Sequence, residues 1–253
     1  IMAAGLPGPA FPKIPVKQVA TETYWSMWGN RHRAARLAIL PLILCTALYL
    51  AQDKLISSST LELISNAIIS FIFLLLVTLI TIPFQVAIHR LTYPGFDFDR
   101  GSYGPPLAII YKFYFLYSIL LSSLPIIIIS IIYTLINALN IFLISILTAF
   151  ISSIICVYIL ASFMLVFPEM AIGVKPDLVR VWWMLRGNVL RLILTIIMTT
   201  APAFFLNAIG IVVYGAFSLL ILGLWACTLS ICYFHITGRQ LLSGDTEVVA
   251  EDP

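Results

Sequence analysis

Charged residues are scarce in this chain of 253 residues. Lys, Arg, Asp and Glu together make up 10% of it, against about a quarter in an average soluble protein. Apolar residues make up 61%, and the mean hydropathy is +1.06. A soluble domain of this length needs a polar surface, and so few polar side chains cannot cover one. The sequence therefore predicts an integral membrane protein.

Motifs for soluble-type catalysis are also lacking. The sequence has no P-loop, no GxSxG, no HExxH and no pair of carboxylates within an apolar run. The four cysteines all lie in apolar runs and have no CxxC spacing, which argues against a metal site or a disulfide framework. We therefore expect no catalytic residue, no cofactor and no metal. Nothing in the sequence indicates nucleic-acid binding.

Six apolar segments are long enough to cross a bilayer as helices. They cover residues 35–51, 63–88, 107–136, 139–167, 189–208 and 211–236. Asn137 and Asn140 supply a turn between the third and the fourth segment. The predicted fold is an all-α, polytopic membrane protein with six transmembrane helices.

The positive charges lie almost entirely on one side of this arrangement. Thirteen of the 14 Lys and Arg residues fall in the N-terminal segment, in the second and fourth connections and in the tail, and only Lys54 falls on the opposite side. The positive-inside rule then predicts that both termini are cytoplasmic.

An internal repeat organises the chain. The segment VKQVATETYWSMWGNRHR begins at Val16, and VKPDLVRVWWMLRGNVLR begins at Val174. Six of the eighteen positions are identical, and the shared core is W-x-x-x-G-N-x-x-R, followed each time by an apolar span. The two copies have parallel sense, so the first two spans correspond to the last two.

The repeat predicts a local structure on the cytoplasmic side. The apolar spacing in each copy is typical of an amphipathic helix in the headgroup layer, before a sharp turn into a span. Gly29 and Gly187 tolerate positive φ at the turn, and Asn30 and Asn188 are suited to cap the next helix. The motif is either a structural anchor or part of a lipid- or partner-binding groove. The groove would be lined by Trp25, Arg33, Trp183 and Arg191, whose two arginines would reach lipid phosphates or a partner's carboxylate.

The repeat and the spans divide the chain into six regions. These are a proline-rich N-terminus (1–15), the first repeat (16–92), a cytoplasmic loop (93–106), a central hairpin (107–167), the second repeat (168–238) and an acidic tail (239–253). Within the hairpin, the small residues Ser145, Ala149 and Ser153 form a stripe on one span. Such a stripe permits close packing, either within the molecule or against a neighbouring protein.

The segment FMLVFPEMAIGVKPDLVRVWWMLRGNVLRL, together with PVKQVATETYWSMWGN near the start, resembles a known group of sequences. It is similar to uncharacterised bacterial inner-membrane proteins and to the membrane domain attached to some glycerophosphodiester phosphodiesterases. This resemblance implies a polytopic helical module in the bacterial inner membrane and no catalytic activity, because the soluble phosphodiesterase domain has no counterpart here. Glu169 departs from the pattern, which usually has an apolar residue there.

Three functions remain open at this point. The first is a non-catalytic accessory or scaffold subunit that binds membrane lipids and neighbouring integral membrane proteins. The second is a lipid or small-solute transporter with a path between the two repeats, for which a cavity bordered by Gln85, Asn66 or Asn207 would argue. The third is a lipid-headgroup enzyme, which would require Glu169, His89 or His235 to converge.

Overall fold

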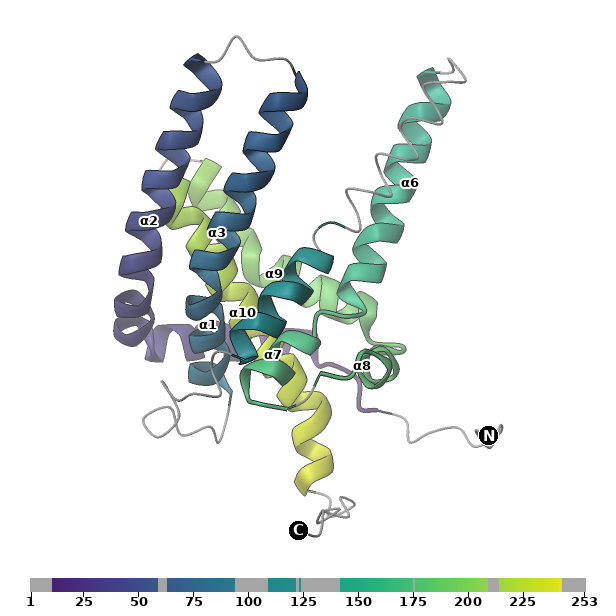
Figure 1. Cartoon of the computed structure of the whole chain (residues 1–253). Coiled ribbons are helices and arrows are strands. Elements are labelled where there is room, and N and C mark those ends of the chain that lie inside the picture. The colour runs from purple at the N-terminus through teal and green to yellow at the C-terminus, as the bar shows by residue number, and fades with distance from the viewer. Residues whose placement is uncertain are drawn as a thin grey trace.

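The computed structural model describes residues 11–58, 63–93, 109–121, 123, 142–174, 176–208 and 214–242, and every regular element in these ranges is a helix. Figure 1 shows α1 (Val16–Gly29), α2 (Arg31–Ser58), α3 (Leu63–Thr92), α6 (Phe142–Ala161), α7 (Val166–Ala171), α8 (Leu178–Leu185), α9 (Val189–Ala208) and α10 (Tyr214–Leu242). A short apolar helix, Ile109–Leu121, lies between α3 and α6 in the chain. The prediction of an all-α fold is confirmed.

Five of these helices are long and apolar enough to cross a membrane. The stretches are Arg31–Leu55, Ile69–Thr92, Phe150–Ala171, Val189–Leu206 and Ala216–Gly238. They correspond to five of the six predicted spans. Of the predicted span 107–136, the structure describes residues 109–121 and 123 only, and the turn at Asn137 and Asn140 lies outside the described residues. The protein is therefore a helical membrane protein with five candidate spans, and the sixth remains a prediction.

Helix α10 is the centre of the bundle. It contacts α1, α2, α3, α7 and α9, and its apolar stretch is the most buried of the five. Gly223 marks one close approach. A Cβ atom at this position would lie 3.4 Å from side-chain atoms of Met27 in α1 and Phe84 in α3. The lack of a side chain at Gly223 allows these two helices to pack closely against α10.

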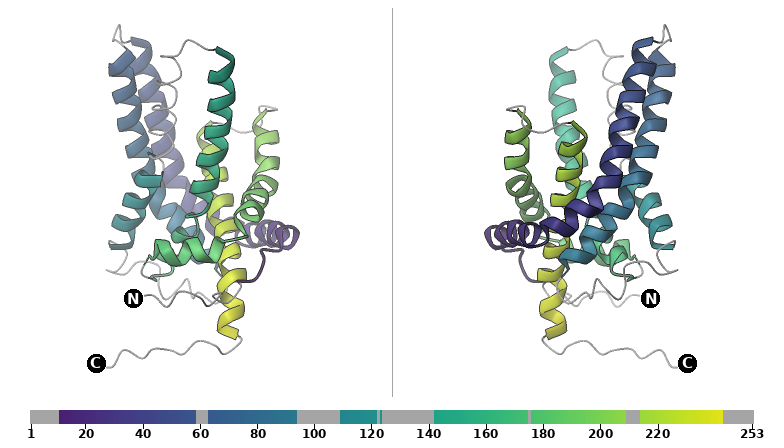
Figure 2. Two further views of the ribbon diagram at one scale, coloured as in Figure 1. Left: turned by 90° about the vertical axis from the view of Figure 1, so that its right-hand side faces the viewer. Right: turned by 90° about the vertical axis from the view of Figure 1, so that its left-hand side faces the viewer.

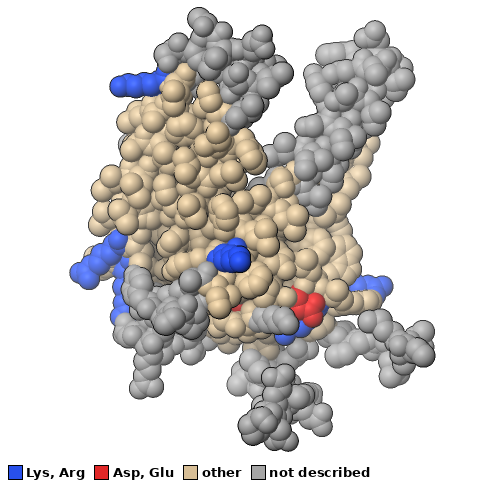
Figure 3. Space-filling view, in the orientation of Figure 1, with Lys and Arg blue, Asp and Glu red and all other residues tan. Residues whose placement is uncertain are grey.

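Helices α1 and α8 lie across the direction of the long helices, at the same end of the molecule (Figures 1 and 2). The first described residues and the C-terminal end of α10 lie at this end too. Most of the Lys and Arg side chains coloured in the view of Figure 3 also lie toward this end, and the coloured surface above them is mainly without charged residues. Trp25 of α1 and Trp183 of α8 therefore lie at the same end of the bundle.

The two Gly-Asn turns differ in structure although their sequences match. Gly187 adopts the positive φ that the sequence predicts, at 82°, whereas Gly29 is the last residue of α1 and is not in the left-handed region. The Asn30 amide donates to the Ser26 carbonyl at 3.0 Å, within its own helix end. Neither asparagine side chain caps the helix that follows. Asn30 bonds to its own helix end, and Asn188 binds a different part of the chain, as described below.

Candidate functional site

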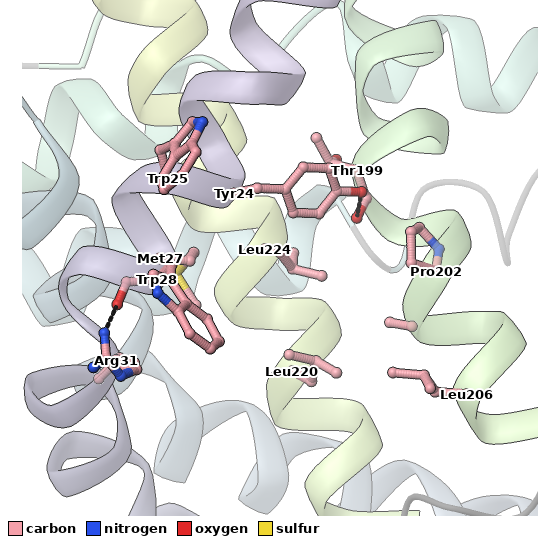
Figure 4. A pocket seen from close by; sticks show the side chains of 12 residues that line it. Tyr24, Trp25, Met27, Trp28, Arg31, Thr199, Pro202, Leu206, Leu220 and Leu224 are labelled. Carbon is pink, nitrogen blue, oxygen red and sulfur yellow. Dashed lines mark hydrogen bonds between the residues drawn. The ribbon is translucent and has the colours of Figure 1, made fainter.

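An apolar groove with a volume of about 600 Å³ lies between α1, α2, α9 and α10 (Figure 4). Its lining comes from both predicted repeats: α1 and α2 belong to the first, and α9 and α10 to the second. The volume falls in the range of ordinary ligand-binding pockets. The lining residues are Tyr24, Trp25, Met27, Trp28, Arg31, Ala34, Thr199, Pro202, Ala203, Leu206, Leu220 and Leu224.

The inner wall of the groove is built by α9 and α10. Ala203 and Leu224 are buried apolar residues, and Leu206 and Leu220 extend the wall along the two helices. Thr199 is also buried, and its hydroxyl is used inside the bundle, where it accepts from the Thr228 hydroxyl at 3.1 Å. The surface that the inner wall presents to a ligand is therefore apolar, which suits contact with an acyl chain.

Tyr24 joins α1 to the part of α9 that contains Pro202. Pro202 lacks an N–H, so the Met198 carbonyl four residues earlier loses its helical donor. The Tyr24 hydroxyl lies 2.8 Å from that carbonyl and 2.9 Å from the Thr199 carbonyl, within donating distance of both. Partial burial raises the pKa of the Tyr24 phenol, so the proton that makes this bond is retained. These hydrogen bonds fix the α1 side of the groove to the α9 side.

The rim of the groove carries two exposed indoles and one cation. Trp25 is 70% exposed and Trp28 is 64% exposed. The Arg31 guanidinium lies 4.8 Å from the centre of the Trp28 ring, and its Nη1 donates to the Trp28 carbonyl at 3.0 Å. These two contacts hold the cation beside the aromatic surface at the junction of α1 and α2. Exposed tryptophans next to arginine are typical of a membrane–water interface.

Of the four residues predicted to line a groove, Trp25 is in this one and the other three lie elsewhere. Trp183 is an exposed residue of α8 that has its own cation partner, since the Arg186 guanidinium lies 5.0 Å from its ring centre. Arg33 is exposed at the start of α2. The structure therefore does not bring the two motif tryptophans together in a single groove.

Arg191 and Asn188 bind the chain's own N-terminal segment. The Asn188 side chain is buried, accepts from the Ile14 N–H at 3.0 Å and donates to the Pro12 carbonyl at 3.1 Å. Arg191 Nη1 donates to the Ile14 carbonyl at 3.2 Å. This asparagine and arginine of the second copy therefore fix the segment that leads into α1. We call these contacts the N-terminal clasp.

The ionisable groups considered for an enzyme have separate partners. Glu169 is buried in α7 and bonds to Arg180 of α8, and Tyr233 of α10 donates to the same carboxylate oxygen at 3.3 Å. His235 Nε2 lies 2.7 Å from a Glu22 carboxylate oxygen. His89 lies beside Ser230 and Tyr114. The described contacts thus link helices in three different places rather than forming one reactive centre.

A second cavity, of about 430 Å³, lies between α3, the helix Ile109–Leu121, the residues around the α6–α7 turn, and α10. Its apolar walls surround a small polar group made of Thr81, Gln85, His89 and Tyr114. Of the three polar residues named for a transporter path, Gln85 borders this cavity. The side chains of Asn66 and Asn207 lie outside the described residues.

The predicted packing stripe is described at one position. Ser153 is exposed on α6, while the side chains of Ser145 and Ala149 lie outside the described residues. Its role in packing stays a prediction.

Sequence reasoning missed most of the groove. Arg31, Tyr24 and the α9 and α10 residues were not singled out, although Pro202 was available as a signal. A proline within an apolar helix leaves a carbonyl that needs an outside donor. A tyrosine on another helix, here Tyr24 of α1, can supply that donor.

Comparisons of the chain with models of protein families, with curated proteins and with solved structures find no match. The resemblance to bacterial inner-membrane proteins therefore depends on the quoted motifs alone.

Proposed function

We propose that this protein is a non-catalytic accessory subunit of a bacterial inner-membrane assembly, and that it binds an anionic phospholipid in the groove between its two repeats. The observation that carries the proposal is the combination in one groove of an apolar inner wall with a rim of Trp25, Trp28 and Arg31. Each part matches one part of a lipid molecule.

The apolar part of the lipid fits the inner wall. Ala203, Leu206, Leu220 and Leu224 offer hydrocarbon contacts, and the Thr199 hydroxyl is bonded inside the bundle. Pro202 brings no N–H into the groove. An acyl chain placed there leaves no polar group of the wall unpaired.

The headgroup fits the rim. An arginine has five N–H donors, and the described contact with the Trp28 carbonyl uses one of its nitrogens. The cation is fixed against an indole, so little side-chain entropy is lost when it binds a phosphate. The two exposed indoles provide the amphipathic surface that lipid headgroup regions favour.

The test is retention of phospholipid by the purified protein. Arg31→Gln removes the cation of the groove, and we expect this variant to lose bound phosphatidylglycerol in native mass spectrometry. Loss of one charged hydrogen bond predicts roughly tenfold weaker binding.

The chain offers a matched control. Arg186 stacks on Trp183 in the same i, i+3 arrangement as Arg31 on Trp28, but it does not line the groove. Arg186→Gln should keep the lipid. Equal loss from both variants, or from neither, would mean that the groove does not hold the phospholipid.

The accessory role is tested by the state of the protein in its own membrane. Leucine, isoleucine and phenylalanine side chains are exposed along α2, α3, α6 and α9, which suits contact with lipid or with other membrane helices. Extraction in a gentle detergent, followed by mass measurement, should recover the chain with an integral membrane partner. A monomer without a partner under all conditions would contradict the role.

A second candidate function is a lipid or small-solute transporter, and the cavity bordered by Gln85 favours it. Proteoliposomes that contain a fluorescent phospholipid test this candidate directly. A transporter of lipid should accelerate the exchange of the label between the leaflets, and Gln85→Leu should reduce the acceleration. A rate equal to that of protein-free vesicles would exclude lipid exchange by this chain.

A further inference from the structure

Trp225 has a buried hydrogen-bond donor that no group in the described part of the chain satisfies. Its indole Nε1 is inaccessible to solvent and has no acceptor, and the residue lines the second cavity. An indole N–H can only donate. In a membrane-embedded bundle, water is not freely available to accept the bond, so a missing partner is costly. A ligand that enters the cavity with an acceptor oxygen would remove this cost.

The polar group across the cavity is fixed in orientation. The Tyr114 hydroxyl donates to Gln85 Oε1 at 3.1 Å, and Gln85 Nε2 donates to the Thr81 hydroxyl at 3.3 Å. His89 Nε2 lies 3.1 Å from the same Tyr114 oxygen. Because Gln85 is held from both sides, its amide keeps one orientation. The –NH₂ group has two protons, and the bond to Thr81 uses one of them.

Trp225 and Gln85 lie at about the same height in the bundle. His89 Nδ1 of α3 is 2.7 Å from the Ser230 hydroxyl of α10, which fixes the register of the two helices. Both helices run from the upper to the lower end of the molecule in Figure 1. Trp225 precedes Ser230 by five residues, which is about 7.5 Å along a helix. The same step back from His89 on α3 reaches the turn that contains Gln85.

The rest of the lining restricts the ligand to a neutral, largely apolar molecule. No Asp, Glu, Lys or Arg is among the described residues that line the cavity. A charged headgroup would therefore be buried without a counter-charge, which is strongly unfavourable. The remaining walls are mainly aliphatic and aromatic, for example Leu74, Leu160 and Phe167.

We propose that this cavity is a binding site for a neutral lipid that bears a carbonyl group, whose oxygen accepts a hydrogen bond from the Trp225 indole N–H at the level of the Gln85 amide. The hydrocarbon part of the lipid lies along the aliphatic walls. The site is separate from the Arg31 groove, because the two share no lining residue. The proposal therefore does not depend on the proposed function.

The experiment observes the indole proton itself. The chain has five tryptophans, so protein labelled with ¹⁵N-tryptophan and purified in an alkyl maltoside gives five indole N–H signals. Trp225→Phe identifies one of them by its loss. Decylbenzoquinone and mono-oleoylglycerol are added separately, because one offers a ring carbonyl and the other an ester carbonyl. We expect at least one of them to move the Trp225 proton downfield while the other four signals stay in place.

Controls separate hydrogen bonding from simple filling of space. Hexadecane has no acceptor and should leave the Trp225 proton in place. Trp225→Phe should weaken binding of the active probe by about tenfold, as expected for one lost bond to a buried donor. Trp25→Phe, which changes a tryptophan of the other groove, should bind the probe as the natural chain does. If Trp225→Phe does not fold, Gln85→Met should weaken binding of the same probe.

Three outcomes would overturn the proposal. The first is that neither carbonyl compound moves the Trp225 signal. The second is that hexadecane moves it as much as they do. The third is that the Trp225 proton exchanges rapidly with water in the absence of any lipid, since a water-filled cavity already satisfies the donor.

Discussion

At the scale of single residues, the most informative contact is the one between Tyr24 and the α9 backbone. Its hydroxyl supplies the Met198 carbonyl with a donor that Pro202 cannot provide. A proline that would weaken an isolated helix thereby provides the carbonyl through which α1 is fixed to α9. This predicts a coupling between two residues that lie far apart in the sequence.

Tyr24→Phe should lower the free energy of unfolding by about 1 kcal/mol, because the Met198 carbonyl, which Pro202 leaves without a helical donor, loses its hydrogen-bond partner. In a Pro202→Ala background the helix regains its own donor, so the same change should cost clearly less. Thermal unfolding of the four proteins in one detergent gives the coupling energy. An equal cost of Tyr24→Phe in both backgrounds would contradict the assignment.

The N-terminal clasp supports a second prediction at this scale. Asn188→Ala removes both bonds that its side chain makes to Pro12 and Ile14, and cleavage by trypsin after Lys13 should become roughly tenfold faster, because the Ile14 N–H loses its buried acceptor. Fragments are identified by mass spectrometry.

Asn30→Ala is the matched control for the clasp. Asn30 occupies the same motif position in the first copy, but its side chain bonds only to the Ser26 carbonyl in the described structure. Cleavage after Lys13 should therefore keep its normal rate. If both variants are cleaved equally fast, the clasp does not hold the N-terminal segment.

These two asparagines also show a limit of prediction from sequence. The motif W-x-x-x-G-N-x-x-R marks both turns correctly, because turn chemistry is local. It cannot say what each side chain binds. One partner of Asn188 comes from a segment 174 residues away, whereas the Asn30 side chain bonds to a carbonyl in its own helix end.

At the scale of the helical elements, apolar length predicted the five observed candidate spans well, because a membrane requires a certain number of apolar residues whatever the tertiary contacts. The prediction was less accurate at a break inside one of them. The segment 139–167 was predicted as a single helix, but α6 ends at Ala161 and α7 begins at Val166. No glycine or proline stands at that break.

A partly buried ion pair holds the element after this break in place. Arg180 of α8 bonds to Glu169 of α7, and Tyr233 of α10 donates to the same carboxylate oxygen. The sequence showed Glu169 only as a departure from an apolar pattern, because its partners are 11 and 64 residues away.

Arg180→Ala should destabilise the protein by about 2–3 kcal/mol, since the buried carboxylate then lacks its cation. The Arg180 side chain is 45% exposed, so the effect should lie below that of a fully buried pair. The double variant Arg180→Ala, Glu169→Gln should recover part of the loss. Chemical unfolding in detergent measures both, and a double variant less stable than Arg180→Ala would contradict this role of the pair.

At the scale of the whole molecule, the distribution of Lys and Arg predicts how the bundle lies in the membrane. Lys54 of α2 and the α1–α8 end should face opposite sides, with the α1–α8 end in the cytoplasm. The four native cysteines are all buried, so an introduced cysteine can be labelled with little background.

Lys54→Cys should react with a membrane-impermeant maleimide in intact cells, and Arg186→Cys should react only after the membrane is opened. Labelling is read by the mass of the protein. The reverse pattern would invert the orientation, and labelling of both sites in intact cells would contradict a membrane-spanning arrangement.

The groove belongs to this largest scale, because four helices from both ends of the sequence have to meet before it exists. The repeated motif singled out Trp25 as a groove residue, but the α9 and α10 wall depends on tertiary packing. The sequence could therefore indicate Trp25 as a residue that lines the groove, but not Leu206 or Leu224.

The most direct measurement of the central claim is photo-crosslinking with a phosphatidylglycerol that carries a diazirine in its acyl chain. After irradiation in membranes, peptide mapping locates the adducts. A lipid in the groove predicts adducts concentrated on residues 199–206 and 220–224, and their loss in Arg31→Gln but not in Arg186→Gln. Adducts spread over the exposed faces of α2 and α6, unchanged by Arg31→Gln, would contradict the claim.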